Sequence, residues 1–337
     1  MRVFMLAVAI AVVLAAPAHA DGGQSLKPWN APWDEGADNC AQRAHKPLEI
    51  RRYDEDTYVL RENLCATWEA PFMYLLIGEK KALLIDTGDV AEPQKMPLAQ
   101  TVAGLVTQHR ALPLLVVHTH RHLDHRAGDP QFANRNNVVV VGYDLDSVRR
   151  FYGFHDWPNG VAHLDLGNRI VDVMPTPGHN ETHVVFYDRK TSLLFSGDFM
   201  LPGRMLVDDP AAEAESARRV ADFIRSRSVA AVLGGHVEMN SAGELFDWES
   251  TWHPHEHALA MKKEDLLALP QAFQSFNGFY SESGKFTFID SMRNLLAVGA
   301  GAILLLLGVA YGLIRLFRRR RSNKLQSQRS PVSTGSG

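Results

Sequence analysis

Residues 115–125 read Leu115-Val116-Val117-His118-Thr119-His120-Arg121-His122-Leu123-Asp124-His125, so an apolar run leads directly into a dense group of imidazole and carboxylate side chains. A short apolar run of this kind is typical of a buried strand. The polar residues that follow then lie on the loop at the end of that strand. Because a loop held by a rigid strand is both fixed and accessible, we expect a functional site there.

The spacing within this loop points to metal binding. His120 and His122 are two residues apart and can point the same way from an extended loop, while Asp124 and His125 can turn towards a second metal beside the first. The chain has 15 histidines but only two cysteines, which excludes a thiolate zinc finger. The pattern therefore predicts two metals held by imidazole and carboxylate.

The surrounding pattern predicts an α/β layered fold, because strand-like runs are interrupted by segments with helical spacing of apolar residues. The expected strands are 57–60, 72–77, 82–85, 114–117, 138–141, 169–173, 183–187, 193–196 and 229–233, and the expected helices are 97–110 and 212–225. A sheet with helices on its outside accounts for this order.

Several of these junctions carry motifs that resemble the metallo-β-lactamase superfamily. The signature Thr-His-x-His-x-Asp-His stands at 119–125, and the family's other turns match Asp86-Thr87-Gly88, Pro177-Gly178-His179, Gly197-Asp198 and Gly235-His236. The resemblance covers most of residues 55–240 and implies an αββα sandwich. Asn180-Glu181-Thr182 replaces the family's usual Thr-Pro-Gly, which changes the pocket wall but no ligand position.

The resemblance also implies a ligand set, which fills all seven expected positions. One metal would be bound by His120, His122 and His179, and another by Asp124, His125 and His236, with Asp198 bridging the two. We expect two zinc ions, with iron or manganese as alternatives. Asp86 either braces the ligand loop or is simply a turn residue.

We expect the chain to be a hydrolase in which a hydroxide shared by the two metals attacks a small-molecule ester, thioester, lactone or β-lactam. Asp124 and Asp198 are the expected catalytic residues, with Asp124 orienting the water and accepting its proton. The alternatives are an iron-dependent redox enzyme of the same superfamily and a non-catalytic membrane-bound binding protein. A net charge of −3 gives no indication of a nucleic-acid partner.

The first 20 residues predict a cleaved signal peptide. Arg2 is followed by the apolar stretch 3–16 and by Ala18-His19-Ala20, the small-x-small pattern of a cleavage site. About 14 apolar residues are too few for a membrane span, which needs about 20. An irregular lead-in is expected over 21–54.

The other end predicts a membrane-spanning helix over 294–317. Residues 295–314 carry no charge and show no polar stripe, which argues against a core helix of a soluble domain. Arg318–Arg321 and Lys324 follow the helix, and basic residues mark the cytoplasmic side. The expected topology is a single pass through the cytoplasmic membrane, with the catalytic domain in the periplasm or outside the cell and the basic tail 318–337 in the cytoplasm. Gly308 and Gly312 offer a surface for helix pairing, and hence for an oligomer.

The extension 241–292 between the expected catalytic domain, 55–240, and the helix matches no family element. Its aromatic residues either pack on the domain or lie near the membrane: Phe273, Phe276, Phe279 and Tyr280. Its cluster His253-Pro254-His255-Glu256-His257 is interpreted as a polar helix start or a pocket wall rather than a third metal site.

Two further sets of residues leave alternatives open. Tyr152, His155, Trp157 and His163 either contact substrate or pack on the surface. Cys40 and Cys65 are the only pair that can form an internal disulfide in an oxidising compartment, and two buried free thiols are the alternative.

Overall fold

The computed structural model describes residues 31–109, 111–283 and 285–327. The predicted signal peptide, the first part of the lead-in and the end of the basic tail lie outside these ranges.

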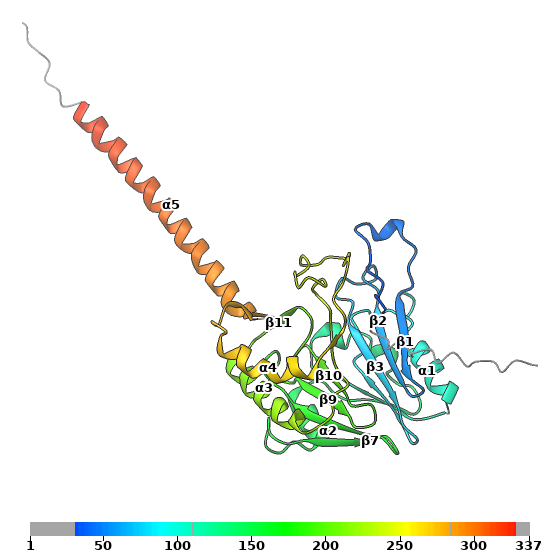
Figure 1. Cartoon of the computed structure of the whole chain (residues 1–337). Coiled ribbons are helices and arrows are strands. Elements are labelled where there is room, and N and C mark those ends of the chain that lie inside the picture. The colour runs from blue at the N-terminus through cyan, green and yellow to red at the C-terminus, as the bar shows by residue number, and fades with distance from the viewer. Residues whose placement is uncertain (1–30, 110, 284, 328–337) are drawn as a thin grey trace, which may run out of the picture.

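Two six-stranded sheets form the centre of the molecule (Figure 1). The first sheet runs in the order β1 (Leu48–Asp54), β2 (Thr57–Glu62), β3 (Phe72–Ile77), β4 (Ala82–Ile85), β5 (Leu114–Val117) and β6 (Val138–Val140). The second runs in the order β13 (Ala260–Met261), β12 (Ala231–Gly234), β10 (Leu193–Gly197), β9 (Val184–Asp188), β8 (Ile170–Pro175) and β7 (Ala162–Asp165). Side chains from both sheets, such as Tyr74 and Phe195, meet in one buried cluster between them.

Helices cover the outer faces of the two sheets. On the first sheet, α1 (Leu98–His109) packs Val102 and Val106 against strand residues such as Leu84. On the second, α3 (Pro210–Arg225) and α4 (Lys263–Gln274) bury Ile224 and Leu266. The short α2 (Leu145–Tyr152) adds Val148 to the central cluster. β3, β4, β9, β10 and β12 are buried on both faces and are therefore mostly apolar, although β9 ends in Asp188 and β10 contains Ser196. This αββα arrangement confirms the predicted fold class.

A small third sheet was not predicted from the sequence. It joins β11 (Arg204–Leu206), β15 (Phe286–Ile289) and β14 (Tyr280–Ser283), with β11 parallel to β15. The extension after residue 240 is therefore bound into the domain by a strand from before α3. The segment 253–257 lies ahead of α4, which begins at Lys263, so it is not the helix start that we expected.

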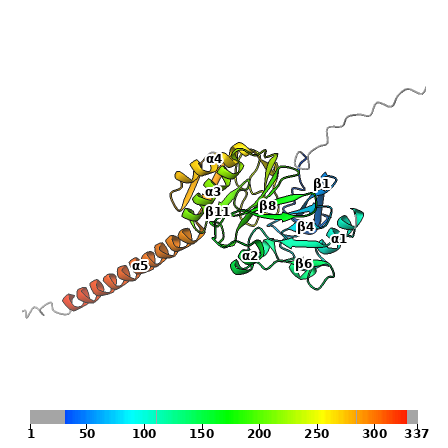
Figure 2. The same ribbon diagram turned by 90° about the horizontal axis from the view of Figure 1, so that it is seen from below.

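The last helix leaves the domain. α5 (Ser291–Ser327) begins after a single residue, Asp290, whose Oδ1 accepts a hydrogen bond from the Arg293 N–H at 2.8 Å. Its segment Ser291–Arg321 is long and apolar enough to cross a membrane. The apolar part of this segment is not buried against the domain, and α5 projects away from it in both views (Figures 1 and 2).

The lead-in is more ordered than predicted. It contains the strand β1, whose alternating Leu48 and Ile50 pair with β2. A disulfide joins Cys40 to Cys65, the first of the two alternatives for these cysteines.

Candidate metal centre

The seven predicted ligand residues lie together at one end of the two sheets. The loop after β5 carries four of them, and the loops after β8, β10 and β12 carry one each. They form two groups in which one ligand atom from each residue lies within 4.8 Å of the others: His120, His122 and His179 in the first, and Asp124, His125, Asp198 and His236 in the second. No third group of this kind occurs among the residues that the structure describes.

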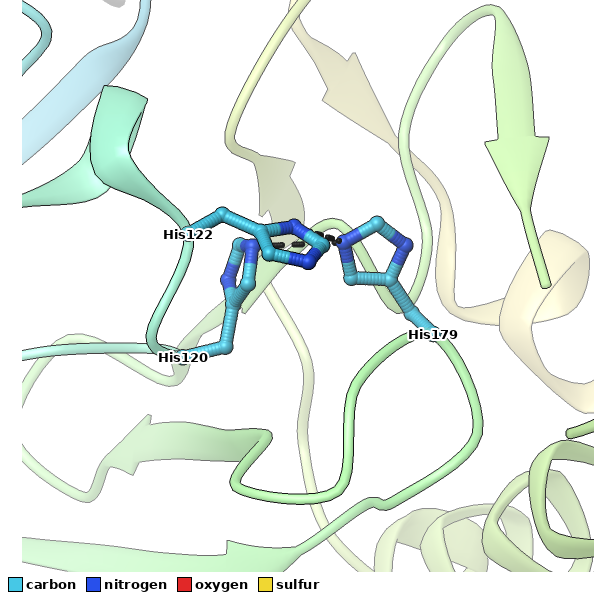
Figure 3. Close-up of side chains that lie close together, drawn as sticks. All are labelled: His120, His122 and His179. Carbon is cyan, nitrogen blue, oxygen red and sulfur yellow. Dashed lines mark hydrogen bonds between the residues drawn. The ribbon is translucent and has the colours of Figure 1, made fainter. Parts of the chain in front are cut away.

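The first group is made entirely of imidazoles, which converge from two loops (Figure 3). His179 Nε2 lies 3.2 Å from His120 Nε2 and 3.0 Å from His122 Nδ1. Two nitrogens that are each about 2.0–2.1 Å from a tetrahedral zinc ion lie roughly 3.3 Å apart. The three nitrogens are therefore spaced nearly as one zinc ion requires.

Hydrogen bonds on the outer side of this group define its tautomers. His179 Nδ1 donates to the Leu206 carbonyl at 2.8 Å, and His120 Nδ1 lies 3.1 Å from Thr119 Oγ1, whose own hydrogen goes to Asp86. Both Nε2 atoms consequently carry lone pairs, and these lone pairs face each other. Such an arrangement fits a cation between them.

The second group repeats this arrangement with two carboxylates added. His125 Nε2 and His236 Nε2 lie 3.2 Å apart, and Asp124 Oδ2 is 3.3 Å from each. On the outer side, His125 Nδ1 lies 2.9 Å from Asp86 Oδ2 and His236 Nδ1 lies 2.7 Å from the Glu69 carbonyl. The outer nitrogens are again hydrogen-bonded, and both inner nitrogens face one point.

Asp198 lies between the two groups. Its Oδ1 is 3.4 Å from His125 Nε2, while its Oδ2 is 3.6 Å from His179 Nε2. The Oδ1 atom is buried and has no hydrogen-bond partner among the described residues. A buried carboxylate oxygen without a hydrogen-bond donor fits a metal ligand, because an unpaired buried charge is otherwise costly.

The charges of the second group perturb its proton affinities. Burial alone would lower the pKa of His236, but Asp198 and Asp124 outweigh it and raise that pKa to about 10. Burial alone would also lower the pKa of His125, but the same two carboxylates and Asp86 outweigh it and hold that pKa well above its ordinary value. In the first group, burial and the neighbouring imidazoles lower the pKa of His120 well below its ordinary value.

Asp86 contacts the ligand loop directly. Its Oδ1 accepts from the Thr119 N–H at 2.7 Å, and its Oδ2 accepts from Thr119 Oγ1 at 2.9 Å as well as facing His125. The residue adopts a left-handed conformation with φ of 66°. Of the two alternatives for Asp86, the geometry therefore supports the bracing role.

Glu213 was missed from the sequence. Its Oε2 accepts from the His179 N–H at 2.7 Å, and the side chain is buried. A Cβ on Gly178, which has φ of 151°, would lie 2.0 Å from that oxygen, so only glycine fits there. No local pattern identifies Glu213, because it stands in α3, more than 30 residues along the chain from His179.

Glu62 and Glu69 were also missed. Glu62 is buried and accepts from the Asp89 N–H at 3.0 Å, which holds the turn after Asp86, and burial raises its pKa to about 8. Burial likewise raises the pKa of Glu69 to about 7, and the nearby Asp124 adds to this rise. Both lie on or beside the loop that follows β2.

The other histidine cluster is structural. Arg61 pairs with Glu256 at 2.6 Å in a buried ion pair, His253 Nδ1 lies 3.1 Å from Glu256, and the His253 ring stacks on Phe246 at 4.0 Å. These contacts join β2 to the extension.

The four residues considered for substrate contact occupy different surroundings. His163 lies on the outermost strand β7 and pairs with Asp172 at 2.6 Å, Trp157 packs on Phe154, and His155 is exposed. Tyr152 lines a small closed cavity beside His120. The packing alternative is therefore favoured for His163 and Trp157.

Comparison with known proteins identifies a matching family, sequence relatives and similar solved structures. The family model described as the metallo-beta-lactamase superfamily matches residues 66–236. The acyl-coenzyme A thioesterase MBLAC2 of Gallus gallus is 25% identical over 244 residues, covering 62% of this chain and 86% of that protein. An atrochrysone carboxyl ACP thioesterase of Aspergillus fumigatus is 28% identical over 153 residues, covering 44% and 45%. The solved metallo-beta-lactamase from Pontibacter korlensis is 17% identical with a TM-score of 0.45, covering 66% and 99%.

Proposed function

The chain belongs to the metallo-β-lactamase superfamily and is a hydrolase of that superfamily, and on this premise we propose that it is a dinuclear enzyme that cleaves an acyl thioester or a related ester, lactone or β-lactam. The observation that carries the proposal is the pairing of the two ligand groups through Asp198, with imidazole nitrogens directed into each.

His120, His122 and His179 would hold one metal, and Asp124, His125 and His236 the other, with Asp198 shared. Zinc suits these nitrogen and oxygen donors, and iron or manganese are alternatives. When bound, such a pair of cations polarises the substrate carbonyl and brings the pKa of a water close to neutrality.

The protein's own side chains would orient the reactants. Burial would raise the pKa of Asp124, but His125 and His236 outweigh it and hold that pKa well below its ordinary range, so the carboxylate stays ionised. Asp124 is partly exposed at the mouth of the centre and is therefore placed to accept a hydrogen bond and a proton from an attacking water at its carboxylate. Asp86 and Glu213 would keep His125 and His179 in place during turnover.

Acyl thioesters are the first substrates to test within this set. Two of the relatives are named as thioesterases, an acyl-coenzyme A thioesterase and an atrochrysone carboxyl ACP thioesterase. The pocket wall at 180–182 departs from the family pattern, and Glu181 pairs there with Arg121 across the two ligand loops. This exposed ion pair lies between the two loops that carry the first ligand group.

Export and membrane anchoring belong to the same proposal. The segment Ser291–Arg321 supports a single membrane pass, and the basic residues 318–321 favour a cytoplasmic end. The Cys40–Cys65 disulfide supports an oxidising compartment for the catalytic domain. We infer that the domain faces the periplasm or the exterior, after removal of the predicted signal peptide 1–20.

The test is turnover by the full chain, purified in detergent and loaded with zinc, against a panel of thioester, ester, lactone, β-lactam and phosphodiester substrates. We expect chelator-sensitive hydrolysis of one acyl class that is lost in Asp198→Ala and retained in His163→Ala, a histidine variant on the outer strand β7. Hydrolysis that survives both the chelator and Asp198→Ala would contradict the proposal. If no substrate of the panel is hydrolysed, and the chain as purified contains iron and absorbs visible light, the redox alternative would replace the hydrolase proposal.

A further inference from the structure

Four aromatic residues of the extension divide into two pairs. Phe273 and Phe276 are packed in the domain, with ring centroids 4.3 Å and 5.8 Å from that of Phe288. Phe279 and Tyr280 remain 46% and 43% exposed. Large exposed rings need an explanation when they gather on one surface, and these two lie beside the base of α5.

The hydrogen bonds of Phe279 define its level relative to α5. Its carbonyl accepts from Asn294 Nδ2 at 2.8 Å and from the Asp290 N–H at 2.9 Å. The uncharged stretch of the helix begins at the next residue, Leu295, and its 20 residues are about 30 Å long, the thickness of the hydrocarbon layer. If α5 spans a membrane, Asn294 would lie where hydrocarbon meets headgroups, and Phe279 would lie at the same level.

The third sheet connects this level with the mouth of the metal centre. Glu282, Thr287 and Arg204 are partners across β14, β15 and β11, so their side chains emerge on one face. The Arg204 guanidinium lies 5.0 Å from the ring centroid of Trp248. It also forms an ion pair with Glu238, with 2.8 Å between Arg204 Nε and Glu238 Oε2. Trp248 is 55% exposed, so this face presents a second large ring to the surroundings.

Trp248 contacts a second tryptophan, which lies next to the metal centre in sequence. Its ring lies 5.5 Å from that of Trp68, and Trp68 precedes Glu69, whose carbonyl accepts from His236 Nδ1 at 2.7 Å. Aromatic rings therefore stand at both ends of this face, Phe279 and Tyr280 at the base of α5 and Trp248 and Trp68 towards a predicted metal ligand. We name this set of four residues the aromatic strip: Phe279, Tyr280, Trp248 and Trp68.

We propose that the aromatic strip lies in the interfacial layer of the membrane that α5 enters, so that the mouth of the metal centre opens at the lipid surface. The proposal rests on the membrane anchoring proposed above and adds an orientation of the domain. Tryptophan and tyrosine favour this layer, because their rings are apolar while their N–H and O–H groups stay hydrated. Only Asp290 separates β15 from α5, so the domain cannot swing freely on a linker. Substrates with an acyl chain in that membrane would reach the centre along the strip.

The orientation can be measured with single-cysteine reporters, since the chain's two cysteines are joined in a disulfide. The full chain is reconstituted in nanodiscs of phosphatidylcholine and phosphatidylglycerol with nitroxide on the headgroup or at mid-chain. A bimane label is placed at Phe279→Cys, Trp248→Cys, Leu305→Cys in α5, or Val139→Cys on β6. Val139 is the matched control, because it is equally exposed and apolar but lies on the edge of the first sheet.

We expect the headgroup nitroxide to remove more than half of the emission at positions 279 and 248 and little at 139, while the mid-chain nitroxide quenches position 305. Quenching at 305 with none at 248 would overturn the strip and leave the anchor intact. No quenching at 305 would instead overturn the anchor and the strip together.

The conservative variant Trp248→Phe gives a second measurement. It should lower the share of intrinsic tryptophan emission that the headgroup nitroxide quenches, whereas Trp157→Phe should not. Equal effects of the two variants would contradict the proposal.

Discussion

The two ligand groups of the metal centre are built on one plan but differ in charge. The first offers three imidazoles, whereas the second offers two imidazoles and two carboxylates. In the first group the outer nitrogens of His179 and His120 are held by a backbone carbonyl and a threonine, while in the second His125 is held by the buried carboxylate of Asp86. The comparison suggests that geometry selects the cation in the first group and that charge attracts it in the second, with Asp198 as the element common to both.

Removing the shared element should have the largest effect. Asp198→Ala takes one oxygen from each group, so we expect two-metal occupancy to be lost and turnover to fall by more than about 100-fold, the upper range for outer-shell partners. Metal content by mass spectrometry and steady-state kinetics measure this. Asp222→Ala, an exposed carboxylate on α3, is the control. Unchanged occupancy in Asp198→Ala would remove the bridging assignment.

A change confined to the second group should separate the two sites. Asp124→Asn removes one negative charge near His125 and His236 while leaving the three imidazoles of the first group untouched. We expect about one metal to remain per chain at limiting zinc, with turnover reduced at least 10-fold. Titration with zinc under a competing chelator would reveal two unequal affinities in the wild type and one weakened affinity in the variant. Equal weakening of both would show that the groups are not independent.

Changing Asp86, which contacts the second group but is not one of its predicted ligands, should reduce zinc affinity less. Asp86→Asn keeps one acceptor for the Thr119 N–H but loses a charged acceptor facing His125 Nδ1. We expect roughly a 10-fold loss of zinc affinity at the second group and a destabilisation of about 1–3 kcal/mol. Thermal unfolding of the metal-free and metal-loaded chains separates the two contributions. A loss of stability without any loss of affinity would make Asp86 a fold residue only.

The smallest effect on the metal centre should come from Glu62, which supports the turn after Asp86 without touching a ligand. Burial raises its pKa to about 8, so the folded state holds a proton that the unfolded state releases near its ordinary pKa of 4.5. Its contribution to stability is thus complete at low pH and is lost as the pH rises from about 4.5 through 8. We expect the metal-free wild type to lose on the order of 3 kcal/mol over this range relative to Glu62→Gln. Denaturant unfolding at pH 5 and pH 9 tests this, and parallel pH profiles would contradict it.

The contrast between local and distant contacts also explains what the sequence could predict. The ligand loop was recognisable because residues 119–125 carry four imidazole or carboxylate side chains, shortly after a strand. The helix over 294–317 was recognisable from its uncharged length, and the structure places it within α5. Both signals are local, so neither needs a distant partner to be read.

The features that were missed depend on such partners. Glu213 supports His179 across 34 residues, and β11 pairs with β15 although about 80 residues of chain separate them. β1 carried a readable alternation in Leu48 and Ile50, which the irregular residues before it concealed. For the third sheet no such signal exists, since its strands are only three or four residues long and become strands through pairing.

The most direct test of the central claim is a crystal structure of the zinc-loaded full chain, with anomalous diffraction measured on both sides of the zinc absorption edge. We predict two zinc peaks per chain, one within bonding distance of His120, His122 and His179 and the other of Asp124, His125 and His236, with Asp198 reaching both. A single peak at saturating zinc, or peaks outside these two groups, would contradict the account.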